Sequence, residues 1–559
     1  MLDSPAIATT SFARVDAIAT QLAKRKAAWV QLGISERLAY LHRCLDGIRT
    51  IAEPWSEAAC QAKGIESTSS LAGEEWIAGP VTVLRNLRLL IKSLEANAQP
   101  LPLRINSGPD GCLVAQVFPD NLMDSLLLLG LTAEVWMEPG QPATQGGIYR
   151  NKHHGGKVAL VLGAGNISSI GPMDTLYKLF VEDQVVVLKM NPVNEYVGPF
   201  IEQAFQPLIQ DGFFDVVYGG AELGSYLCQH PEIDTVHITG SHHTHDLIVW
   251  GSTPEEQSLR KAANKPMLSK PITSELGCVT PILIVPGSWS KADIAFQARH
   301  VASMVAHNAS FNCVAAKVVV TAKGWKQQGA FLAQLRQELA AIPPRQAYYP
   351  GAQQRYQAFL DHYPQAEALA TRTEQVVPWT VIAELPPKEG EYALTQEAFC
   401  GVLAEVALDA ADAREFLTQA VDFANQKVWG TLSCTLLIDP ATARSCAAEV
   451  ETAIANLRYG TISLNVWSGI AYFLGSTTWG AFPGHPLTDI ASGRGVVHNT
   501  YLFDYPQKSV VRALFRMRPT PIWFANHKNL LQLAKRLTAF EAAPTWKKLL
   551  AVVFAALQG

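Results

Sequence analysis

An alternation of short apolar runs with helical patterns, between residues 158 and 270, most constrains how this chain of 559 residues can fold. The apolar runs predict strands at residues 158–162, 185–188, 214–217 and 235–238, and the segments between them predict helices near 172–180, 197–209 and 223–230. Repeated strand-helix-strand units imply a parallel sheet with right-handed crossovers and with ligand sites at the carboxyl ends of the strands. This segment therefore predicts an α/β nucleotide-binding domain.

The loop after the first predicted strand, residues 163–168, reads Gly-Ala-Gly-Asn-Ile-Ser and lacks the third glycine of the usual dinucleotide fingerprint. The last predicted strand instead runs into Gly240 and Ser241. A helix that begins there has free N–H groups that suit a pyrophosphate. An ordinary turn followed by a helix N-cap explains the same two residues equally well.

Cys313 is preceded by small and polar residues and followed by an apolar run at 318–320. This arrangement can hold a thiol at the mouth of a pocket, although most intracellular cysteines are small buried hydrophobes. Two other residues favour chemistry: Glu275, which is followed by Leu-Gly, and Asn166 in the loop after the first strand. A cysteine, a glutamate and an asparagine are the parts that acyl chemistry through a thioester requires.

Six short motifs in order make the chain resemble the aldehyde dehydrogenase superfamily over roughly residues 20–515, as a divergent member with a C-terminal extension. The motifs are Gly165-Asn166, Val187-Leu188-Lys189, Ile238-Thr239-Gly240-Ser241, Glu275-Leu276-Gly277, residues 308–313 and residues 397–403. The resemblance implies a catalytic Cys313 that attacks an aldehyde carbon and forms a thiohemiacetal and then a thioester. It also implies that Asn166 and the Cys313 N–H hold the oxyanion, and that Glu275 is the general base for hydrolysis.

The resemblance further implies NAD or NADP as cofactor, with five binding residues. Lys189 is expected at the adenosine ribose, Gly240 and Ser241 at the pyrophosphate, and Glu397 and Phe399 at the nicotinamide ribose and ring.

Several positions depart from the family pattern. Pro192 stands where the family commonly has a carboxylate that selects an unphosphorylated ribose, and Glu195 is the nearest acid, so the choice between NAD and NADP stays open. The other departures are Ser310 and Phe311 in place of Gly-Gln, and Cys278 and Cys400.

The leading interpretation is oxidation of an aldehyde to a carboxylic acid. The alternatives are a CoA-acylating aldehyde dehydrogenase or acyl reductase, and a non-catalytic scaffold.

The resemblance suggests interleaved domains rather than domains in series. Residues 1–270 are expected to hold N-terminal helices and the dinucleotide-binding domain, interrupted by a small β oligomerisation hairpin at about 98–157. An α/β catalytic domain is expected at 271–475, followed at 476–515 by a return to the cofactor domain and an oligomerisation strand. Residues 500–514 resemble a strand that family members lend to a neighbouring subunit, so a homodimer or homotetramer is expected.

Two further segments have open interpretations. The largely apolar insert at 122–136 is expected either to pack against a partner or to cover the site. The extension at 516–559 can lie on a membrane surface, pack on the enzyme or make a subunit contact, and the last two are favoured. Aromatic residues in the segment 467–479 are expected to line the entrance for a largely apolar aldehyde; they are Trp467, Tyr472, Phe473 and Trp479.

Composition excludes some classes of partner. A net charge of −4 gives no indication of nucleic-acid binding, and nine cysteines without a CxxC pair argue against a disulfide framework or structural zinc.

In the run 242–246, helix geometry brings at most His242 and His245 together, so no metal site is predicted. Residues 1–10 lack a secretory signal and no apolar run approaches the roughly 18 residues of a membrane span, so a cytoplasmic protein is expected.

Overall fold

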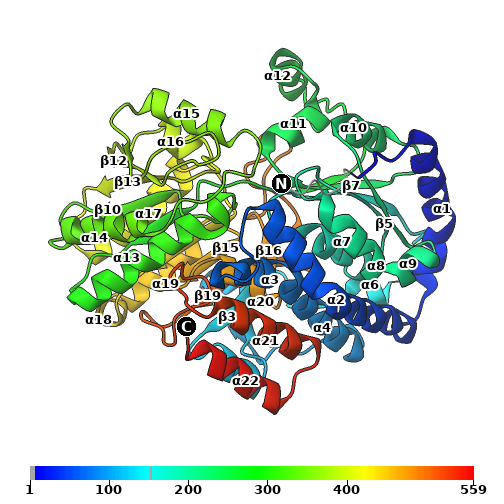
Figure 1. The fold of residues 1–559 in the computed structure, drawn as a ribbon, viewed down its shortest axis with the longest axis horizontal. Coiled ribbons are helices and arrows are strands. Elements are labelled where there is room, and N and C mark those ends of the chain that lie inside the picture. Colours follow the sequence, from blue (N-terminus) through cyan, green and yellow to red (C-terminus); the bar gives the residue numbers. More distant parts are fainter. Residues whose placement is uncertain (1–6, 152–153) are drawn as a thin grey trace.

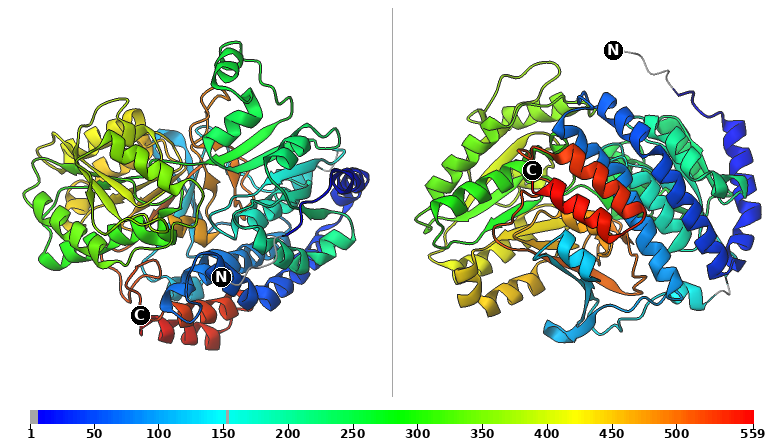
Figure 2. Two further views of the ribbon diagram at one scale, coloured as in Figure 1. Left: turned by 45° about the horizontal axis from the view of Figure 1, so that its top comes forward. Right: turned by 60° about the horizontal axis from the view of Figure 1, so that its bottom comes forward.

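The computed structural model describes residues 7–151 and 154–559, which form two lobes with helices packed beneath them (Figure 1; Figure 2, left). One lobe is built on a six-stranded sheet of order β17-β8-β7-β4-β5-β6, and an eleven-stranded sheet runs through the other. The predicted α/β fold with a parallel nucleotide-binding sheet is confirmed. Residues 1–6, which belong to the stretch in which no secretory signal is expected, lie outside the described residues.

The six-stranded sheet contains all four strands predicted from the alternating pattern. They are β4 (Val158–Leu162), β5 (Val185–Lys189), β6 (Phe214–Val217) and β7 (Thr235–Gly240), and they pair in parallel. Every residue of β4 and β5 is buried, because parallel sheets of this kind are covered by helices on both faces. These helices are α7 (Ile170–Phe180), α8 (Gly198–Ala204), α9 (Gln206–Gln210) and α10 (Ala221–Gln229). The helix predicted at 197–209 is therefore two helices.

The change from one sheet to the other occurs after Glu275. The strand β8 (Ile272–Leu276) pairs with β7, so Glu275 belongs to the nucleotide sheet although the catalytic domain was expected to begin at residue 271. The next strand, β9 (Pro281–Ile284), lies in the eleven-stranded sheet. Late in the chain, β17 (Gly493–Arg494) returns to pair with β8.

The eleven-stranded sheet joins a catalytic sheet to the expected hairpin. Its central strands are parallel and include β10 (Val318–Ala322), β13 (Val402–Leu408), β14 (Ser433–Leu437) and β15 (Thr461–Leu464). At one end, β19 (Pro506–Arg512) pairs in parallel with β15 and antiparallel with β3 (Thr132–Met137). Both edges of β19 are thus paired with strands of its own chain, and the expectation that this strand is lent to a neighbouring subunit stays a prediction.

Helices from both ends of the chain lie together under the lobes (Figure 2, right). The N-terminal set includes α2 (Ile34–Ala62) and α4 (Thr82–Glu95), and the extension supplies α21 (Leu530–Ala542) and α22 (Trp546–Ala556). The apolar side chains of the two extension helices form one cluster with Val81 and Phe473. Packing on the enzyme, one of the favoured interpretations of the extension, is therefore observed.

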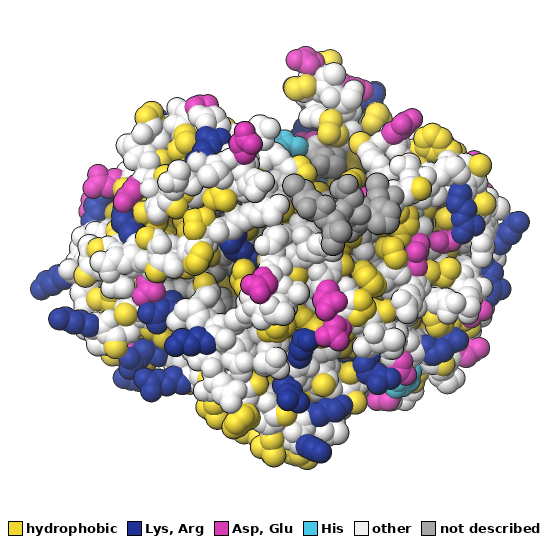
Figure 3. Space-filling model, viewed as in Figure 1, with side chains coloured by type: hydrophobic (Ala, Val, Ile, Leu, Met, Phe, Trp, Pro, Cys, Tyr) yellow, Lys and Arg dark blue, Asp and Glu magenta, His cyan; other side chains and the backbone are white. Residues whose placement is uncertain are grey.

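The apolar insert does not cover the site. Its short helix α5 (Leu122–Leu127) lies against α22, and Met123 and Leu127 join the cluster of the extension. The outer face of α22 remains exposed, and Leu550 and Phe554 are among its exposed apolar residues. Hydrophobic side chains gather at the lower edge of the view in Figure 3, where α22 lies in Figure 1. None of the helices in the described residues is both long and apolar enough to cross a membrane.

Candidate active site

Cys313 lies where two cavities meet. A cleft of about 930 Å³ opens between the lobes, and a smaller cavity of about 70 Å³ lies on the other side of the thiol. Cys313 and Glu275 line both spaces. The cleft also brings together all eight residues that were predicted for the site; they are Cys313, Glu275, Asn166, Lys189, Gly240, Ser241, Glu397 and Phe399.

The loop that carries Cys313 is strained. It follows α13 (Lys291–Ala306), and Asn308, Ala309 and Ser310 take φ values of 53°, 53° and 68°. This left-handed conformation disfavours residues with a Cβ by roughly 1–2 kcal/mol each. Ser310 stands where the resembled family has glycine, which takes such a φ freely. Other contacts must therefore hold the loop in place.

Asn308 supplies most of these contacts. Its Oδ1 accepts hydrogen bonds from Lys63 Nζ and Tyr348 Oη, both at 3.0 Å. Its Nδ2 donates to the carbonyl oxygens of Asn166, at 3.1 Å, and Phe311, at 2.8 Å. Buried side-chain networks of this kind fix one geometry when every member is satisfied. The Asn308 side chain thus connects the loop that carries Cys313 to the loop that carries Asn166.

Sequence reasoning missed the charged groups behind this network. Lys63 forms a buried ion pair with Glu75 at 2.9 Å, and Glu74 pairs with Arg345 at 2.7 Å. Glu74 also accepts a hydrogen bond from the Asn308 backbone N–H at 3.2 Å. No local pattern marks these residues, because the partners are separated by up to 271 positions in the chain.

Two N–H groups are available for an oxyanion. The Asn166 amide donates to the Phe311 carbonyl at 3.1 Å, which orients the group and leaves its second N–H free to face the cleft. Among the described residues, the Cys313 backbone N–H has no hydrogen-bond acceptor. Such donors stabilise the negative oxygen of a tetrahedral intermediate.

The Cys313 thiol and the Glu275 carboxyl both have raised pKa values. The pKa of Glu275 is raised to about 8, chiefly by burial and also by the Asp174 carboxylate, while the neighbouring Cys313 side chain opposes this rise. Burial also raises the pKa of the Cys313 thiol well above its usual range, as do the nearby Glu275 and Glu397 carboxyl groups. A base is therefore needed to produce the thiolate. The Glu275 side chain is close enough to the thiol to act on its pKa, while Cys313 Sγ itself donates to Asn312 Oδ1 at 3.8 Å.

Glu397 is held beside the Glu275 strand by an ion pair. Lys317 Nζ lies 3.2 Å from Glu397 Oε1 and also donates to the Cys313 carbonyl at 3.2 Å. The Glu397 carboxyl lies so close to Gly277 that a Cβ built at Gly277 would be 1.9 Å from Glu397 Oε2. A side chain at Gly277 would displace the Glu397 carboxyl, so the glycine of the Glu-Leu-Gly motif keeps this carboxyl in its position beside the cleft.

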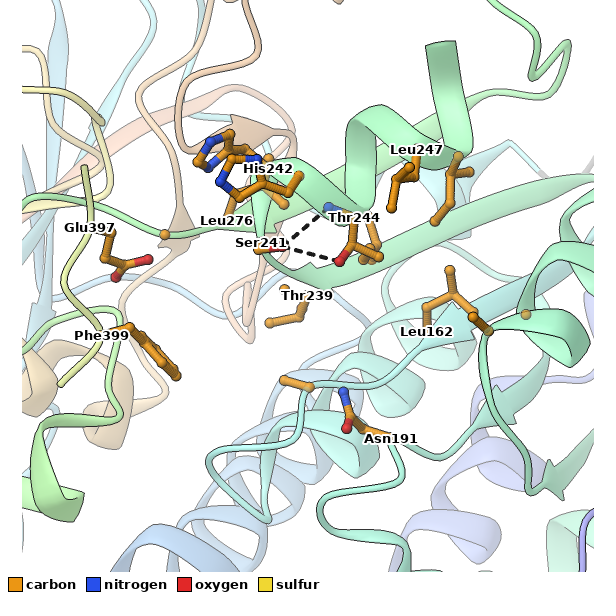
Figure 4. Close-up of a pocket in the computed structure, with 18 of the residues that line it drawn as sticks. Leu162, Asn191, Thr239, Ser241, His242, Thr244, Leu247, Leu276, Glu397 and Phe399 are labelled. Carbon is orange, nitrogen blue, oxygen red and sulfur yellow. Dashed lines mark hydrogen bonds between the residues drawn. The ribbon is translucent and has the colours of Figure 1, made fainter. Parts of the chain in front are cut away.

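The cleft has the features that a dinucleotide requires. The strand β7 ends at Gly240, and Ser241 caps α11 (His242–Trp250) by accepting a hydrogen bond from the Thr244 N–H at 3.1 Å. Ser241 at this helix start lies opposite Glu397 and Phe399 in Figure 4, and Lys189 also lines the cleft. A helix N-terminus and a lysine suit phosphate and ribose groups, so the residues present fit NAD or NADP.

Two further features of the sequence have a smaller part in the site: Glu195, the acid nearest to Pro192, and the histidine run at 242–246. Glu195 is close enough to Lys189 for the lysine charge to act on its pKa, but it does not line the cleft. In the histidine run, Asp246 is taken up by His245 at 3.1 Å and Lys261 at 2.6 Å. Within the described parts of the chain, no cluster of three or more His, Cys, Asp or Glu residues is arranged to hold a metal ion.

The small cavity is lined mainly by apolar and aromatic side chains. Trp467, Tyr472, Phe473 and Trp479 all line it, as walls of the cavity rather than as an exposed entrance. Trp467 Nε1 donates to the Val314 carbonyl at 2.9 Å, which links this wall to the nucleophile loop.

Comparison with known proteins agrees with this geometry. The sequence profile of the aldehyde dehydrogenase family matches residues 163–354. The 4-trimethylaminobutyraldehyde dehydrogenase A of Danio rerio is 32% identical over 100 residues, which are 18% of this chain and 17% of that protein. The human 4-trimethylaminobutyraldehyde dehydrogenase is 36% identical over 76 residues, which are 14% of this chain and 13% of that protein. The sequence matches thus span less than a fifth of these relatives.

Solved structures match over most of the chain. Gamma-glutamyl-gamma-aminobutyraldehyde dehydrogenase from Burkholderia cenocepacia has a TM-score of 0.61 at 19% identity, covering 91% of this chain and 90% of that one. The NADP complex of glyceraldehyde-3-phosphate dehydrogenase from Methanocaldococcus jannaschii has a TM-score of 0.61 at 13% identity, covering 90% and 95%. Residues 163–354 are therefore an aldehyde dehydrogenase family domain, and the chain as a whole has the aldehyde dehydrogenase fold.

Proposed function

We propose that this chain is an NAD(P)-dependent aldehyde dehydrogenase that oxidises an aldehyde to a carboxylic acid through a cysteine thiohemiacetal and thioester. One observation carries the proposal: Cys313 and Glu275 stand together at the boundary between a dinucleotide-sized cleft and a small apolar cavity. A reaction that moves a hydride from an aldehyde carbon to a nicotinamide needs its nucleophile at such a boundary.

In the proposed reaction, Glu275 first releases its own proton to solvent, its carboxylate then accepts the Cys313 thiol proton, and the thiolate attacks the aldehyde carbon. The Asn166 amide and the Cys313 N–H hold the resulting oxyanion. When bound, NAD or NADP accepts the hydride that leaves the thiohemiacetal carbon. Glu275, after releasing its proton to solvent, then takes a proton from the water that attacks the thioester carbonyl. Hydrolysis breaks the carbon–sulfur bond, returns the thiol and releases the carboxylic acid.

Water is the proposed acyl acceptor because Glu275 lines both cavities beside Cys313, and its carboxylate, once ionised, can activate a water molecule. The CoA-acylating alternative would pass the acyl group to a thiol and would not need this base. A non-catalytic scaffold would not need the strained loop and the buried ion pairs that support it.

The test is nicotinamide absorbance over time with purified protein, an aldehyde panel, NAD or NADP, and with or without CoA. The panel includes an aliphatic aldehyde, an aromatic one and 4-trimethylaminobutyraldehyde. We expect reduction without CoA that falls at least about 10⁴-fold in Cys313→Ala, with unchanged cofactor binding. Turnover only with CoA would establish the acylating alternative. Silence with every aldehyde, together with a Cys313 that does not react with iodoacetamide at neutral pH, would establish the scaffold.

We also propose a cytoplasmic homodimer or homotetramer. The compartment is supported by the cysteines, since all nine are free thiols. Assembly is supported by the edge strand β1 (Arg104–Ser107), where Leu103 and Ile105 are exposed and unpaired backbone groups can meet a second copy. Sedimentation analysis of the parent and of Ile105→Lys tests the assembly, and a monomeric parent would refute it.

A further inference from the structure

Two residues of the C-terminal extension reach the space where the aldehyde would lie. Ile522 and Trp523 line the small cavity together with Cys313 and Glu275. Both belong to residues 516–559, which lie beyond the part of the chain that resembles the family. Trp523 is only 6% exposed, so its ring is part of the packed wall.

The segment that carries these residues is fixed to the nucleophile helix. The Ala525 N–H donates to Ser303 Oγ on α13 at 3.0 Å. The Phe524 ring stacks on His300 of the same helix at 5.3 Å between centroids. Because α13 leads directly into the Cys313 loop, the extension and the nucleophile share one support.

A second link joins the extension to another wall of the cavity. Glu541 on α21 is fully buried and pairs with Arg85 at 2.9 Å and Arg88 at 2.6 Å. Arg85 Nε in turn donates to the carbonyl of Leu474 at 2.7 Å. Leu474 ends α20 (Gly469–Leu474), the helix that places Ile470, Tyr472 and Phe473 in the cavity. The extension is thus a fixed part of this wall.

The size and charge of the cavity define what it accepts. A volume of about 70 Å³ holds roughly five to seven water-sized groups, at about 10–15 Å³ each. Apart from the base Glu275, the cavity offers no uncompensated charge. Glu74 is paired with Arg345 at 2.7 Å, and burial lowers the pKa of His307, which therefore stays neutral.

We propose that the C-terminal extension, through Ile522 and Trp523, sets the length of the aldehydes that this chain oxidises, and that these aldehydes are compact, uncharged and largely apolar. The inference rests on the proposed function, since it assigns the small cavity to the aldehyde. It goes further in giving the extension a direct part in substrate selection.

The main experiment compares kcat/KM for butanal and decanal in the parent, Trp523→Ala and Trp546→Ala. Trp546 lies on the same extension but is half-exposed and does not line the cavity, so it is the matched control. We expect the parent to favour butanal, and Trp523→Ala to raise the decanal-to-butanal ratio at least about tenfold, because even one methylene in a pocket is worth about 10-fold or more. The control should stay within about twofold.

Ile522 supplies two further variants in case Trp523→Ala does not fold. Ile522→Ala should shift the ratio toward decanal, and Ile522→Phe should shift it toward shorter aldehydes than the parent prefers. Circular dichroism and thermal unfolding identify which variants are folded. An unchanged ratio in every folded variant at these two positions would overturn the inference, and a preference for 4-trimethylaminobutyraldehyde over butanal would overturn the uncharged substrate class.

A labelling experiment separates this inference from the proposed function, because it needs no turnover. Cys313 is half-buried and the other eight cysteines are buried, so alkylation of Cys313 can be followed by mass spectrometry. With NAD and NADP present to fill the cleft, Trp523→Ala should react at least about fivefold faster than the parent with N-decyl iodoacetamide, and equally fast with iodoacetamide. That result without any aldehyde oxidation would reject the proposed function and keep the role of the extension. Equal rates with both reagents would overturn that role.

Discussion

The two cavities that meet at Cys313 are built in opposite ways. The cleft is lined by short motifs at the carboxyl ends of strands of one sheet, such as Lys189 at the end of β5 and Gly240 at the end of β7. The small cavity is assembled from segments far apart in the chain, from Glu74 to Trp523. The cleft therefore depends mainly on local motifs, whereas the small cavity depends on contacts between distant segments.

The largest expected effect concerns Glu275, the proposed base, which lines both cavities. Glu275→Gln should slow thioester hydrolysis by about 10²–10⁴-fold, the usual contribution of a general base. Rapid mixing should still show a burst of reduced nicotinamide if another group or solvent takes the thiol proton, and mass spectrometry should then find acylated Cys313. Hydrolysis at the parent rate would assign the base role to another residue.

The next effect concerns Glu541, which connects the extension to a wall of the small cavity through Arg85 and Leu474. Although burial raises the pKa of Glu541, the Arg88 and Arg85 guanidinium groups lower it below its usual range, so the carboxylate is charged. Glu541→Ala leaves the partly buried Arg88 without its partner and the buried Arg85 with only the longer contact to Asp124 at 3.9 Å, and should lower the free energy of unfolding by about 3–5 kcal/mol.

Lys535→Ala on the same helix removes an exposed pair with Glu53 and a cation–π contact with Trp76, and should change the free energy of unfolding by at most about 1–2 kcal/mol. Denaturant unfolding measures both, and equal losses would contradict the fixed role of the extension.

A third effect is specific to the cleft. Lys189→Ala should raise the KM for NAD or NADP by about 10- to 100-fold, since a hydrogen bond from a charged group contributes about 1.5–3 kcal/mol. Selection among aldehydes should not change, because Lys189 does not line the small cavity. The exposed Lys265→Ala is the control. A changed ratio of decanal to butanal turnover in Lys189→Ala would show that the two spaces are not independent.

The smallest expected effect is the pH dependence. Only the ionised form of Glu275 accepts a proton, and its pKa is raised to about 8, so hydrolysis should accelerate as pH rises. Between pH 7 and pH 8 the ionised fraction grows about fivefold, and the rate should level off above pH 8. Single-turnover hydrolysis measures this, with Glu275→Gln expected to show no such rise. A rate that is flat from pH 6 to pH 9 in the parent would contradict the raised pKa.

The difference between the cavities also explains how far sequence reasoning reached. The strands β4 to β7 and the eight residues that line the cleft could be predicted from the sequence, because apolar periodicity and short motifs are local signals. Lys63 could not be found in this way, because it directly follows a helix with an ordinary pattern and meets Asn308, a residue 245 positions further along the chain, only in the folded protein. The pairing of β19 with β15 was also missed, because a strand by itself does not specify which chain its neighbour belongs to.

The sequence by itself determined the α/β class, the parallel nucleotide sheet and the identities of the residues that surround Cys313. These properties depend on local periodicity and on residue chemistry at short spacing. Tertiary structure alone decided that Glu275 is buried with a raised pKa, that Asn308 holds the strained loop, and that Trp523 lines the small cavity beside Cys313. Burial, strain and cavity shape arise from contacts between distant segments, and no local pattern encodes them.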